Sequence, residues 1–246
     1  MNCFETTAGL YDSINSGQYS PYASFLRHCF NNFSKIKVNE VLDLGCGTGG
    51  IARLLSEYGY DMVGVDNSPD MLSVAHSAAK GGGDILYICQ DMRELELYGT
   101  VQAAYSSFDC LNYLESNTEL DCVFALLRNY IETGGLLVFD VNTLYRYDKV
   151  FDGNSFVYEF GEDMLVWQNQ FSSAKKICDF YLTLFKREKG AYKRFDERQR
   201  QKYFPQKTLL SLLRKNGFSV VGIYGSTELT PLEKTSEKAY FLAVAQ

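Results

Sequence analysis

The sequence has no excess of basic residues and no long apolar run. The formal net charge of its 246 residues is −6 at pH 7, which disfavours attraction to phosphate backbones and to anionic membranes. No apolar stretch reaches the roughly 18 residues of a membrane-spanning helix, and the N-terminus lacks the basic start and apolar core of a signal peptide. We therefore expect a cytoplasmic protein with no nucleic-acid partner and no membrane partner.

The sequence also lacks a pattern of closely spaced cysteine pairs. The seven cysteines are an odd number and include no Cys-x-x-Cys pair, which argues against a disulfide framework and against a zinc site. Most of them stand among apolar residues, a setting that predicts small, buried thiols in a reducing compartment. These are Cys29, Cys46, Cys89, Cys110, Cys122 and Cys178. We expect no bound metal.

The chain contains no internal repeat and no low-complexity segment. Its length fits one sizeable domain with a small insertion. Aromatic residues make up 15% of the chain, with 18 Tyr and 17 Phe, which is more than packing alone requires. We expect some of these rings to line a binding cleft.

Strands and helices alternate regularly from residue 40 to residue 140. Helical spacing of apolar residues predicts one helix after the glycine-rich turn, one capped by Ser68 with Pro69 in its first turn, and one ending at Gly134 and Gly135. Apolar strands separated by helices indicate a parallel sheet covered on both faces. The predicted strands lie at 40–44, 61–66, 85–89, 101–107 and 136–140.

Different patterns flank this region. A helix is predicted to begin at Pro21 and to cover the fold as a cap. After Asn142 the apolar period falls from about 3.6 to about 2, which indicates an antiparallel insertion. Its strands lie at 156–160, 164–171, 177–186 and 191–204, and a helix from Pro205 and strands at 218–224 and 239–245 follow.

The whole pattern predicts an α/β fold. The expected architecture is a Rossmann-like, mostly parallel seven-stranded sheet with helices on both faces, plus a small antiparallel β insertion. The expected domains are an N-terminal helical cap (1–38), a Rossmann-like cofactor-binding core (39–150), the β insertion on the substrate side (151–204), and a C-terminal helix with the last two core strands (205–246).

The last strand of the insertion has two different faces. One face is charged and is expected to be solvated: Arg194, Asp196, Arg198, Arg200 and Lys202. The other face is polar but largely uncharged, and suits the wall of a wet pocket: Phe195, Glu197, Gln199, Gln201 and Tyr203.

A glycine-rich turn follows the first strand and suits a nucleoside-bearing ligand, because glycine accepts positive φ and permits close approach to the backbone. Gly45, Gly47 and Gly50 fit the dinucleotide pattern Gly-x-Gly-x-x-Gly, with Asp66 placed for a ribose. Gly45, Gly47 and Gly49 equally fit a pattern with an acid, Asp43, two residues earlier. A carboxylate there repels a pyrophosphate but suits an ammonium and a sulfonium, which favours S-adenosylmethionine over NAD.

The run Asp43-Leu44-Gly45-Cys46-Gly47-Thr48-Gly49 resembles the first motif of the class I S-adenosylmethionine-dependent methyltransferases. The resemblance implies S-adenosyl-L-methionine as cofactor and S-adenosylhomocysteine as product. It also implies that Asp66 holds the ribose hydroxyls and that Asp91 accepts the adenine amino group. Each acid alone could be a helix cap, but their places at successive strand ends favour a ligand site. The implied cofactor residues are Asp43, Gly45, Cys46, Gly47, Gly49, Asp66, Asn67, Met71, Asp91, Met92 and Phe108.

The segment 107–113 follows the fourth strand, where that family reaches from cofactor to acceptor. It lacks the Pro-Pro-aromatic run of DNA amino methylases, and we identify no acidic cluster of the metal-dependent catechol type. The chain is similar instead to small-molecule methyltransferases with an N-terminal cap and a β insertion after strand five. This similarity implies N- or O-methylation by in-line transfer. The catalytic candidates are Tyr11, Asp109, Asn112, Tyr113 and Glu197, with Gln199 helping to orient the acceptor.

Two other functions remain open from the residues alone. One is an NAD-dependent oxidoreductase, and the other is a catalytically inactive cofactor-binding protein of the same fold. His28 falls off the apolar stripe of its helix and is expected at the surface, as only a weak candidate for a base. The sequence leaves a monomer or a homodimer open.

Overall fold

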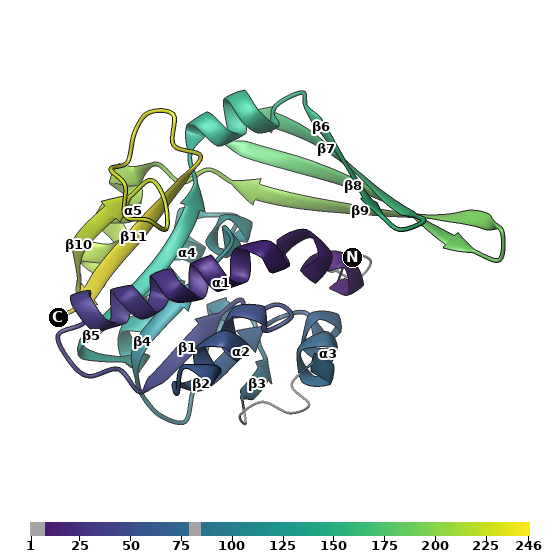
Figure 1. Cartoon of the computed structure of the whole chain (residues 1–246). Coiled ribbons are helices and arrows are strands. Elements are labelled where there is room, and N and C mark those ends of the chain that lie inside the picture. Colours follow the sequence, from purple (N-terminus) through teal and green to yellow (C-terminus); the bar gives the residue numbers. More distant parts are fainter. Residues whose placement is uncertain (1–7, 79–84) are drawn as a thin grey trace.

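The structure is a computed structural model that describes residues 8–78 and 85–246. The strands of its main sheet are β1 (Glu40–Leu44), β2 (Asp61–Asp66), β3 (Leu86–Cys89), β4 (Val101–Ser106), β5 (Ile131–Asn142), β10 (Phe218–Tyr224) and β11 (Lys238–Ala245). They lie in the order β10-β11-β5-β4-β1-β2-β3 (Figure 1). Strands β1 to β5 are parallel, and β11 is antiparallel to both β5 and β10. The predicted α/β fold with a mostly parallel seven-stranded sheet is confirmed.

Helices cover both faces of the main sheet: α1 (Ala8–Phe33), α2 (Gly50–Glu57), α3 (Pro69–Ala78), α4 (Asn117–Tyr130) and α5 (Gln206–Lys215). Leu26 of α1 and Leu55 of α2 pack against one face with Val138 of β5. Phe124 of α4 and Leu213 of α5 pack against the other face. Burial of each such side chain contributes about 1.5–3 kcal/mol. The described residues also form three short helices: η1 (Met92–Glu94), η2 (Cys110–Tyr113) and the π-helix η3 (Arg146–Phe151).

A second sheet follows η3. Its antiparallel strands are β6 (Ser155–Phe160), β7 (Asp163–Ser172), β8 (Ile177–Glu188) and β9 (Ala191–Lys202), in the order β6-β7-β8-β9. Leu10 and Ile14 of α1 pack against its buried cluster. The first turns of α1 therefore contact the second sheet, and the rest of α1 contacts the main sheet (Figure 1). The division of the chain into domains stays a prediction, and residues 1–7 of the predicted cap lie outside the described residues.

Helix α1 does not begin at Pro21, so that prediction is wrong. The helix begins at Ala8 and carries Pro21 inside it. Proline cannot donate a backbone hydrogen bond and typically costs about 3 kcal/mol in a helix interior. Tyr19 and Tyr22 flank Pro21 and are 8% and 3% exposed, so packing against the main sheet offsets this cost.

The glycines after α4 belong to β5, not to a helix end, which corrects a second prediction. Helix α4 ends at Tyr130, and β5 begins at Ile131. The pairing of β4 with β5 shifts register next to these glycines, between Val101 and Ala103. A Cβ on Gly135 would lie 2.5 Å from the Gln102 carbonyl oxygen, so glycine is required where the two strands approach.

Two of the cysteines predicted to be buried are exposed. Cys89 ends β3, which is the edge strand of the main sheet. Cys122 lies two residues from Leu120 on α4 and so points away from the buried face of that helix. Within residues 8–78 and 85–246, no helix is long and apolar enough to cross a membrane, and no cluster of acidic, His or Cys side chains is arranged for a metal.

Candidate active site

The glycine turn between β1 and α2 has the backbone conformation that its sequence predicted. Gly45, Gly47 and Gly49 have φ angles of +82°, +52° and +72°, in the region that favours glycine. A Cβ on Gly45 would meet the Cys110 Sγ at 2.2 Å, whereas a Cβ on Gly47 would meet nothing closer than the Tyr11 ring at 3.9 Å. Gly47 therefore presents its backbone to open space beside α1.

Two carboxylates stand at the ends of β2 and β3. Asp66 accepts hydrogen bonds from the backbone N–H groups of Gly47 at 2.8 Å and Ser68 at 2.9 Å. Burial raises the pKa of Asp66, while those backbone donors act against the rise. Asp91 binds the Arg93 guanidinium at 2.6 and 3.0 Å, and this hydrogen bonding lowers its pKa. Hydrogen bonds from nearby groups of the chain therefore orient both carboxylates.

The third acid, Asp43, lies below the turn within β1. Its side chain is 1% exposed and accepts a hydrogen bond from the Tyr105 hydroxyl at 2.6 Å. Burial raises its pKa to about 7. Its second oxygen, Oδ1, has no hydrogen-bond partner within the described part of the chain.

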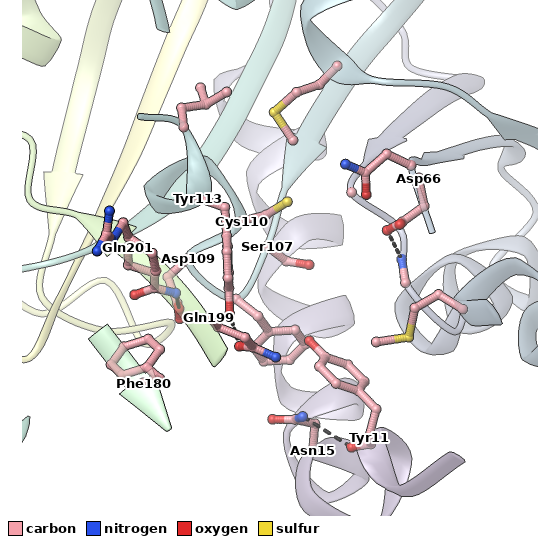
Figure 2. Close-up of a pocket in the computed structure, with 18 of the residues that line it drawn as sticks. Tyr11, Asn15, Asp66, Ser107, Asp109, Cys110, Tyr113, Phe180, Gln199 and Gln201 are labelled. Atoms are coloured by element: carbon pink, nitrogen blue, oxygen red, sulfur yellow. Dashed lines mark hydrogen bonds between the residues drawn. The ribbon is translucent and has the colours of Figure 1, made fainter. Parts of the chain in front are cut away.

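A cavity of about 640 Å³ runs from the glycine turn to the second sheet. Figure 2 shows Asp66 on one side of it, Asp109, Tyr113, Gln199 and Phe180 on the other, and Tyr11 entering from α1. Most predicted site residues line it: Tyr11, Gly45, Gly47, Asp66, Asn67, Met71, Asp91, Met92, Phe108, Asp109 and Tyr113. The predicted residues outside its lining are Asp43, Cys46, Gly49, Asn112 and Glu197.

The turn after β4 contains two successive non-glycine residues in the left-handed region, Phe108 at φ 53° and Asp109 at φ 55°. Such backbone persists only where its surroundings hold it. The Asp140 carboxylate accepts both backbone N–H groups at 2.8 and 2.9 Å, and also the Tyr22 hydroxyl at 2.6 Å. Asp140 is fully buried at the end of β5, and Lys238 of β11 pairs with it at 2.7 Å.

The Asp109 side chain is fixed by the same cation. Lys238 Nζ donates to it at 2.8 Å, and Gln201 Nε2 donates at 2.5 Å. Burial opposes ionisation of Asp109, but Lys238 and Arg146 outweigh it and lower its pKa. Burial likewise acts against the charge of Lys238, but Asp109 and Asp140 raise its pKa above the usual value. Asp109 is therefore an ionised carboxylate and a weak base.

Asn112 lies away from the cavity and links three elements. Its amide donates to the Lys202 carbonyl at 2.7 Å, and its oxygen accepts from the Asn142 backbone at 2.9 Å. The side chain is fully buried. These bonds give Asn112 of η2 a structural position between β9 and β5.

Tyr113, Gln199 and Glu197 form a directed chain of hydrogen bonds. The Tyr113 hydroxyl donates to Gln199 Oε1 at 2.8 Å. Gln199 Nε2 donates to Glu197 Oε1 at 2.6 Å. Because the hydroxyl has one proton and gives it to Gln199, the Tyr113 oxygen can act only as an acceptor towards any further group.

Helix α1 is fastened to the glycine turn by polar contacts. Asp12 accepts hydrogen bonds from the Tyr19 hydroxyl at 2.7 Å and from the Thr48 hydroxyl at 2.5 Å. These bonds place Tyr11, one residue before Asp12, over the turn. Burial raises the pKa of Tyr11 well above its usual value, so its hydroxyl stays protonated.

Comparison with known proteins identifies the family. The methyltransferase domain family matches residues 41–135. A protein of Geobacillus sp. (strain WCH70), whose name assigns it to the methyltransferases, is 32% identical over 251 residues, covering 98% of this chain and 98% of the relative. The crystal structure of an S-adenosylmethionine-dependent methyltransferase from Clostridium acetobutylicum ATCC 824 has a TM-score of 0.87 at 26% identity over 99% of both chains. This chain belongs to the class I S-adenosylmethionine-dependent methyltransferases.

The methyltransferase shares its fold with more distant enzymes as well. A sugar N-methyltransferase from Streptoalloteichus sp. ATCC 53650 matches 96% of this chain, and 92% of its own, with a TM-score of 0.78 and 19% identity. A match of this extent includes both sheets, so the second sheet belongs to the shared fold. Membership of the family removes the NAD-dependent oxidoreductase alternative.

Sequence reasoning missed several residues of the methyltransferase site. Asp140 ends the predicted strand 136–140 and lies two residues before the end of β5, so its place near a strand end was an available signal. No sequence pattern pointed to Lys238 or Arg146, because only the fold brings β11 and η3 to the cavity. Gln201 was recognised as facing a pocket, and the structure shows it holding Asp109.

Proposed function

We propose that this methyltransferase methylates an amine nitrogen of a small molecule bound between α1, η2 and the second sheet. The observation that carries the proposal is the state of Asp109, the carboxylate on the acceptor side of the cavity. Lys238 and Gln201 bind both its oxygens, and its pKa is lowered. A hydroxyl acceptor needs a base, whereas a free amine already carries the lone pair that attacks the methyl group.

The cofactor half of the cavity fits S-adenosylmethionine. We assign the ribose hydroxyls to Asp66 and the adenine to Met71, Asp91 and Met92, all of which line the cavity. Asp43 is buried beneath the glycines outside this lining, so we assign it no direct contact with the cofactor. Bound in this half of the cavity, the cofactor supplies a methyl group on a sulfonium, which is already a good leaving group. The protein then has to align the acceptor and exclude water.

Tyr113 supports an amine acceptor by the direction of its hydrogen bonds. Its hydroxyl proton goes to Gln199, so its oxygen accepts an N–H from the acceptor. An amine that donates one N–H keeps its lone pair for the methyl group. Tyr11, Asp109 and Glu197 then serve as positioning residues rather than bases, and we assign Asn112 a structural role in place of a catalytic one.

Histidine offers no alternative base. The chain has two histidines, and neither His28 nor His76 lines the cavity. Both are exposed. The sugar N-methyltransferase that shares this fold also supports nitrogen as the acceptor atom.

The test pairs calorimetry with a transfer assay. S-adenosylhomocysteine should bind in isothermal titration, and labelled methyl should pass to primary amines but not to alcohols of the same carbon skeleton. The rate should rise with pH towards the pKa of the amine, because the protein supplies no base. Faster transfer to the alcohols would contradict the choice of nitrogen, and binding without transfer to any acceptor would support an inactive cofactor-binding protein.

A further inference from the structure

The cavity-facing side of the second sheet changes from polar to apolar across its strands. The register places Gln199 of β9 opposite Phe180 of β8, and Glu197 of β9 opposite Leu182 of β8. Leu182 in turn lies opposite Trp167 of β7. Residues paired in this way share one face of the sheet. One face therefore carries a polar strip (Glu197, Gln199 and Gln201) beside an apolar strip (Leu165, Trp167, Phe180 and Leu182). Glu197, and the buried Asn169 of β7 that pairs with Phe180 on the same face, lie outside the cavity lining.

The apolar strip lines the same cavity as the glycine turn. The Trp167 ring lies 5.7 Å from Phe151 and 5.4 Å from Phe180, measured between ring centroids. Its indole N–H is buried and has no hydrogen-bond partner within the described residues. A bound molecule that met this wall would find rings and methyl groups.

Most cations of the cavity are closely paired with carboxylates. A nucleotide or phosphate body would require cations that lack such partners. Four of the five Lys and Arg side chains in the lining have a carboxylate oxygen at 3.1 Å or less: Arg93, Arg198, Arg200 and Lys238. The fifth, Arg146, lies 3.7 Å from Glu237 without a hydrogen bond, and its guanidinium lies 4.9 Å from the centre of the Phe151 ring. Arg198 and Arg200 share Asp179, and their side chains are 55% and 49% exposed, so they stand at the rim.

We propose that the acceptor is an amine with a flat, apolar body that lies on the apolar strip while its nitrogen lies at the polar strip. This inference rests on the proposed N-methylation and names the class of acceptor. The span from β9 to β7 covers two strand spacings, or about 10 Å. That length fits an aromatic ring joined to an amine by a short alkyl chain.

The wild-type protein provides its own probe. Trp167 is the single tryptophan of the chain, so its fluorescence reports on the apolar strip. With S-adenosylhomocysteine saturating, 4-phenylbutylamine should change this fluorescence saturably. It should bind about tenfold or more tightly than 2-(2-aminoethoxy)ethanol or glucosamine, because only its body is apolar.

Two variants on one strand sharpen the test. Leu182→Asn places an amide in the cavity wall and should weaken the binding of 4-phenylbutylamine about tenfold or more. Leu184→Asn is the matched control, because Leu184 is on the same face of β8 and 4% exposed but outside the cavity lining. Unchanged binding of S-adenosylhomocysteine shows that each variant is folded.

The outcomes separate this inference from the proposed function. Equal or tighter binding of the polar amines, or no saturable response to 4-phenylbutylamine, would overturn the inference. Methylation of polar amines in that case would leave N-methylation standing. Tight binding of 4-phenylbutylamine without any methylated product would support the apolar strip and count against the amine as methyl acceptor.

Discussion

At the scale of single residues, Asp140 holds more of the site together than any residue that the motifs identified. It binds the two left-handed backbone positions before η2, the Tyr22 hydroxyl of α1 and the Lys238 ammonium of β11. A buried hydrogen-bond network of this kind is favourable only while each of its donors and acceptors is paired. Its removal leaves Lys238 facing Asp109 alone.

We expect Asp140→Ala to lower the free energy of unfolding by about 3–5 kcal/mol, because it removes one partner of a buried ion pair. Urea denaturation measures this loss. Asp121→Ala is the control, because Asp121 pairs with the mostly exposed Lys215, and its loss should cost about 1 kcal/mol or less. Equal losses in the two variants would contradict the role of Asp140.

Asp43 gives stability a pH dependence with a defined sign. Burial raises its pKa from 3.8 to about 7, so the folded chain keeps a proton that the unfolded chain loses between these values. The free energy of unfolding should fall as pH rises through this window, by an amount on the order of 4 kcal/mol. Asp43→Asn should remove that part of the slope in urea titrations at pH 4 to 8. An unchanged slope would show that Asp43 is ionised throughout.

Tyr113→Phe tests the directed hydrogen-bond chain. Loss of the hydroxyl should lower kcat/KM for an amine about 10- to 100-fold and leave the affinity for S-adenosylhomocysteine unchanged, because one hydrogen bond to the acceptor is lost. Tyr98→Phe is the control, since Tyr98 is fully exposed.

The isosteric changes Asp109→Asn and Glu197→Gln should also reduce turnover without affecting cofactor binding. Full activity in all three would exclude the polar strip and η2 from the reaction.

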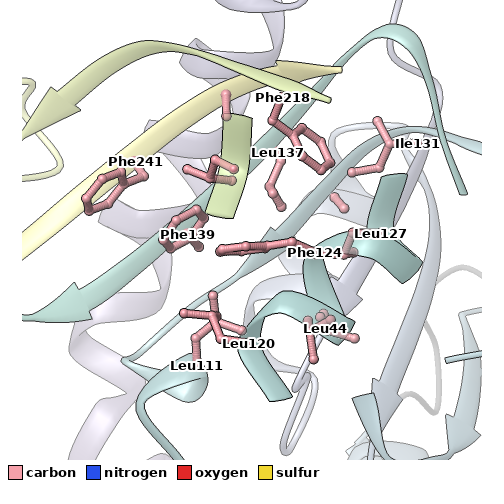
Figure 3. Packing of buried hydrophobic residues seen from close by; sticks show 14 of the residues in the cluster. Leu44, Leu111, Leu120, Phe124, Leu127, Ile131, Leu137, Phe139, Phe218 and Phe241 are labelled. Atoms are coloured by element: carbon pink, nitrogen blue, oxygen red, sulfur yellow. The ribbon is translucent and has the colours of Figure 1, made fainter. Parts of the chain in front are cut away.

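At the scale of elements, packing rather than local propensity decides where the helices lie. Figure 3 shows Phe124 of α4 beside Phe139, Leu127 and Leu120, within the cluster that joins α4 to the main sheet. These apolar positions recur at helical spacing, so α4 was predictable from sequence. The first turns of α1 have a weaker pattern, and their contacts with the second sheet and the glycine turn appear only in the folded chain.

Replacing glycine by alanine should have opposite effects on stability in two of the helices. Gly17 of α1 has open space around its Cβ position, so Gly17→Ala should stabilise the protein by about 0.5–1 kcal/mol through helix propensity. A Cβ on Gly50 of α2 would lie 2.2 Å from the Tyr19 ring, so Gly50→Ala should destabilise it. Thermal unfolding measures both. A stabilising Gly50→Ala would mean that α1 moves freely on α2.

At the scale of the whole molecule, the proposed cofactor half and the proposed acceptor half of the cavity come from different layers. The glycine turn and Asp66 belong to the main sheet, whereas the polar and apolar strips belong to the second sheet. Helix α1 contacts both. Ligand binding should therefore stabilise the entire fold rather than one part of it.

S-adenosylhomocysteine at about 100 times its Kd should stabilise the wild type by about 2.7 kcal/mol, read as a rise in Tm. Asp66→Ala should largely abolish this rise, because Asp66 holds Gly47 and is assigned to the ribose. Asp70→Ala is the control, because Asp70 is on the exposed side of α3, and this variant should show the same rise in Tm as the wild type. An undiminished rise in Asp66→Ala would remove Asp66 from the cofactor site.

The sequence by itself determined the sheet, the glycine turn and the acids at the strand ends. Strands β1 and β2 were predicted with their observed bounds, because buried parallel strands read as apolar runs and glycine marks the positive φ angles. The alternation in β9 likewise separated Gln199 and Gln201 from the charged face. These features depend on residues that are neighbours along the chain.

The ionisation and the hydrogen bonding of the catalytic candidates became known only from the tertiary structure. Asp109 resembled a reactive acid until Lys238, which is 129 positions away in sequence, was found to neutralise it. Asn112 was predicted as a catalytic amide, and its hydrogen bonds to Lys202 and Asn142 support the structural role that we propose for it instead. Burial and ion pairing set the pKa and hydrogen-bonding capacity of a side chain, and both depend on contacts between distant segments that no local pattern encodes.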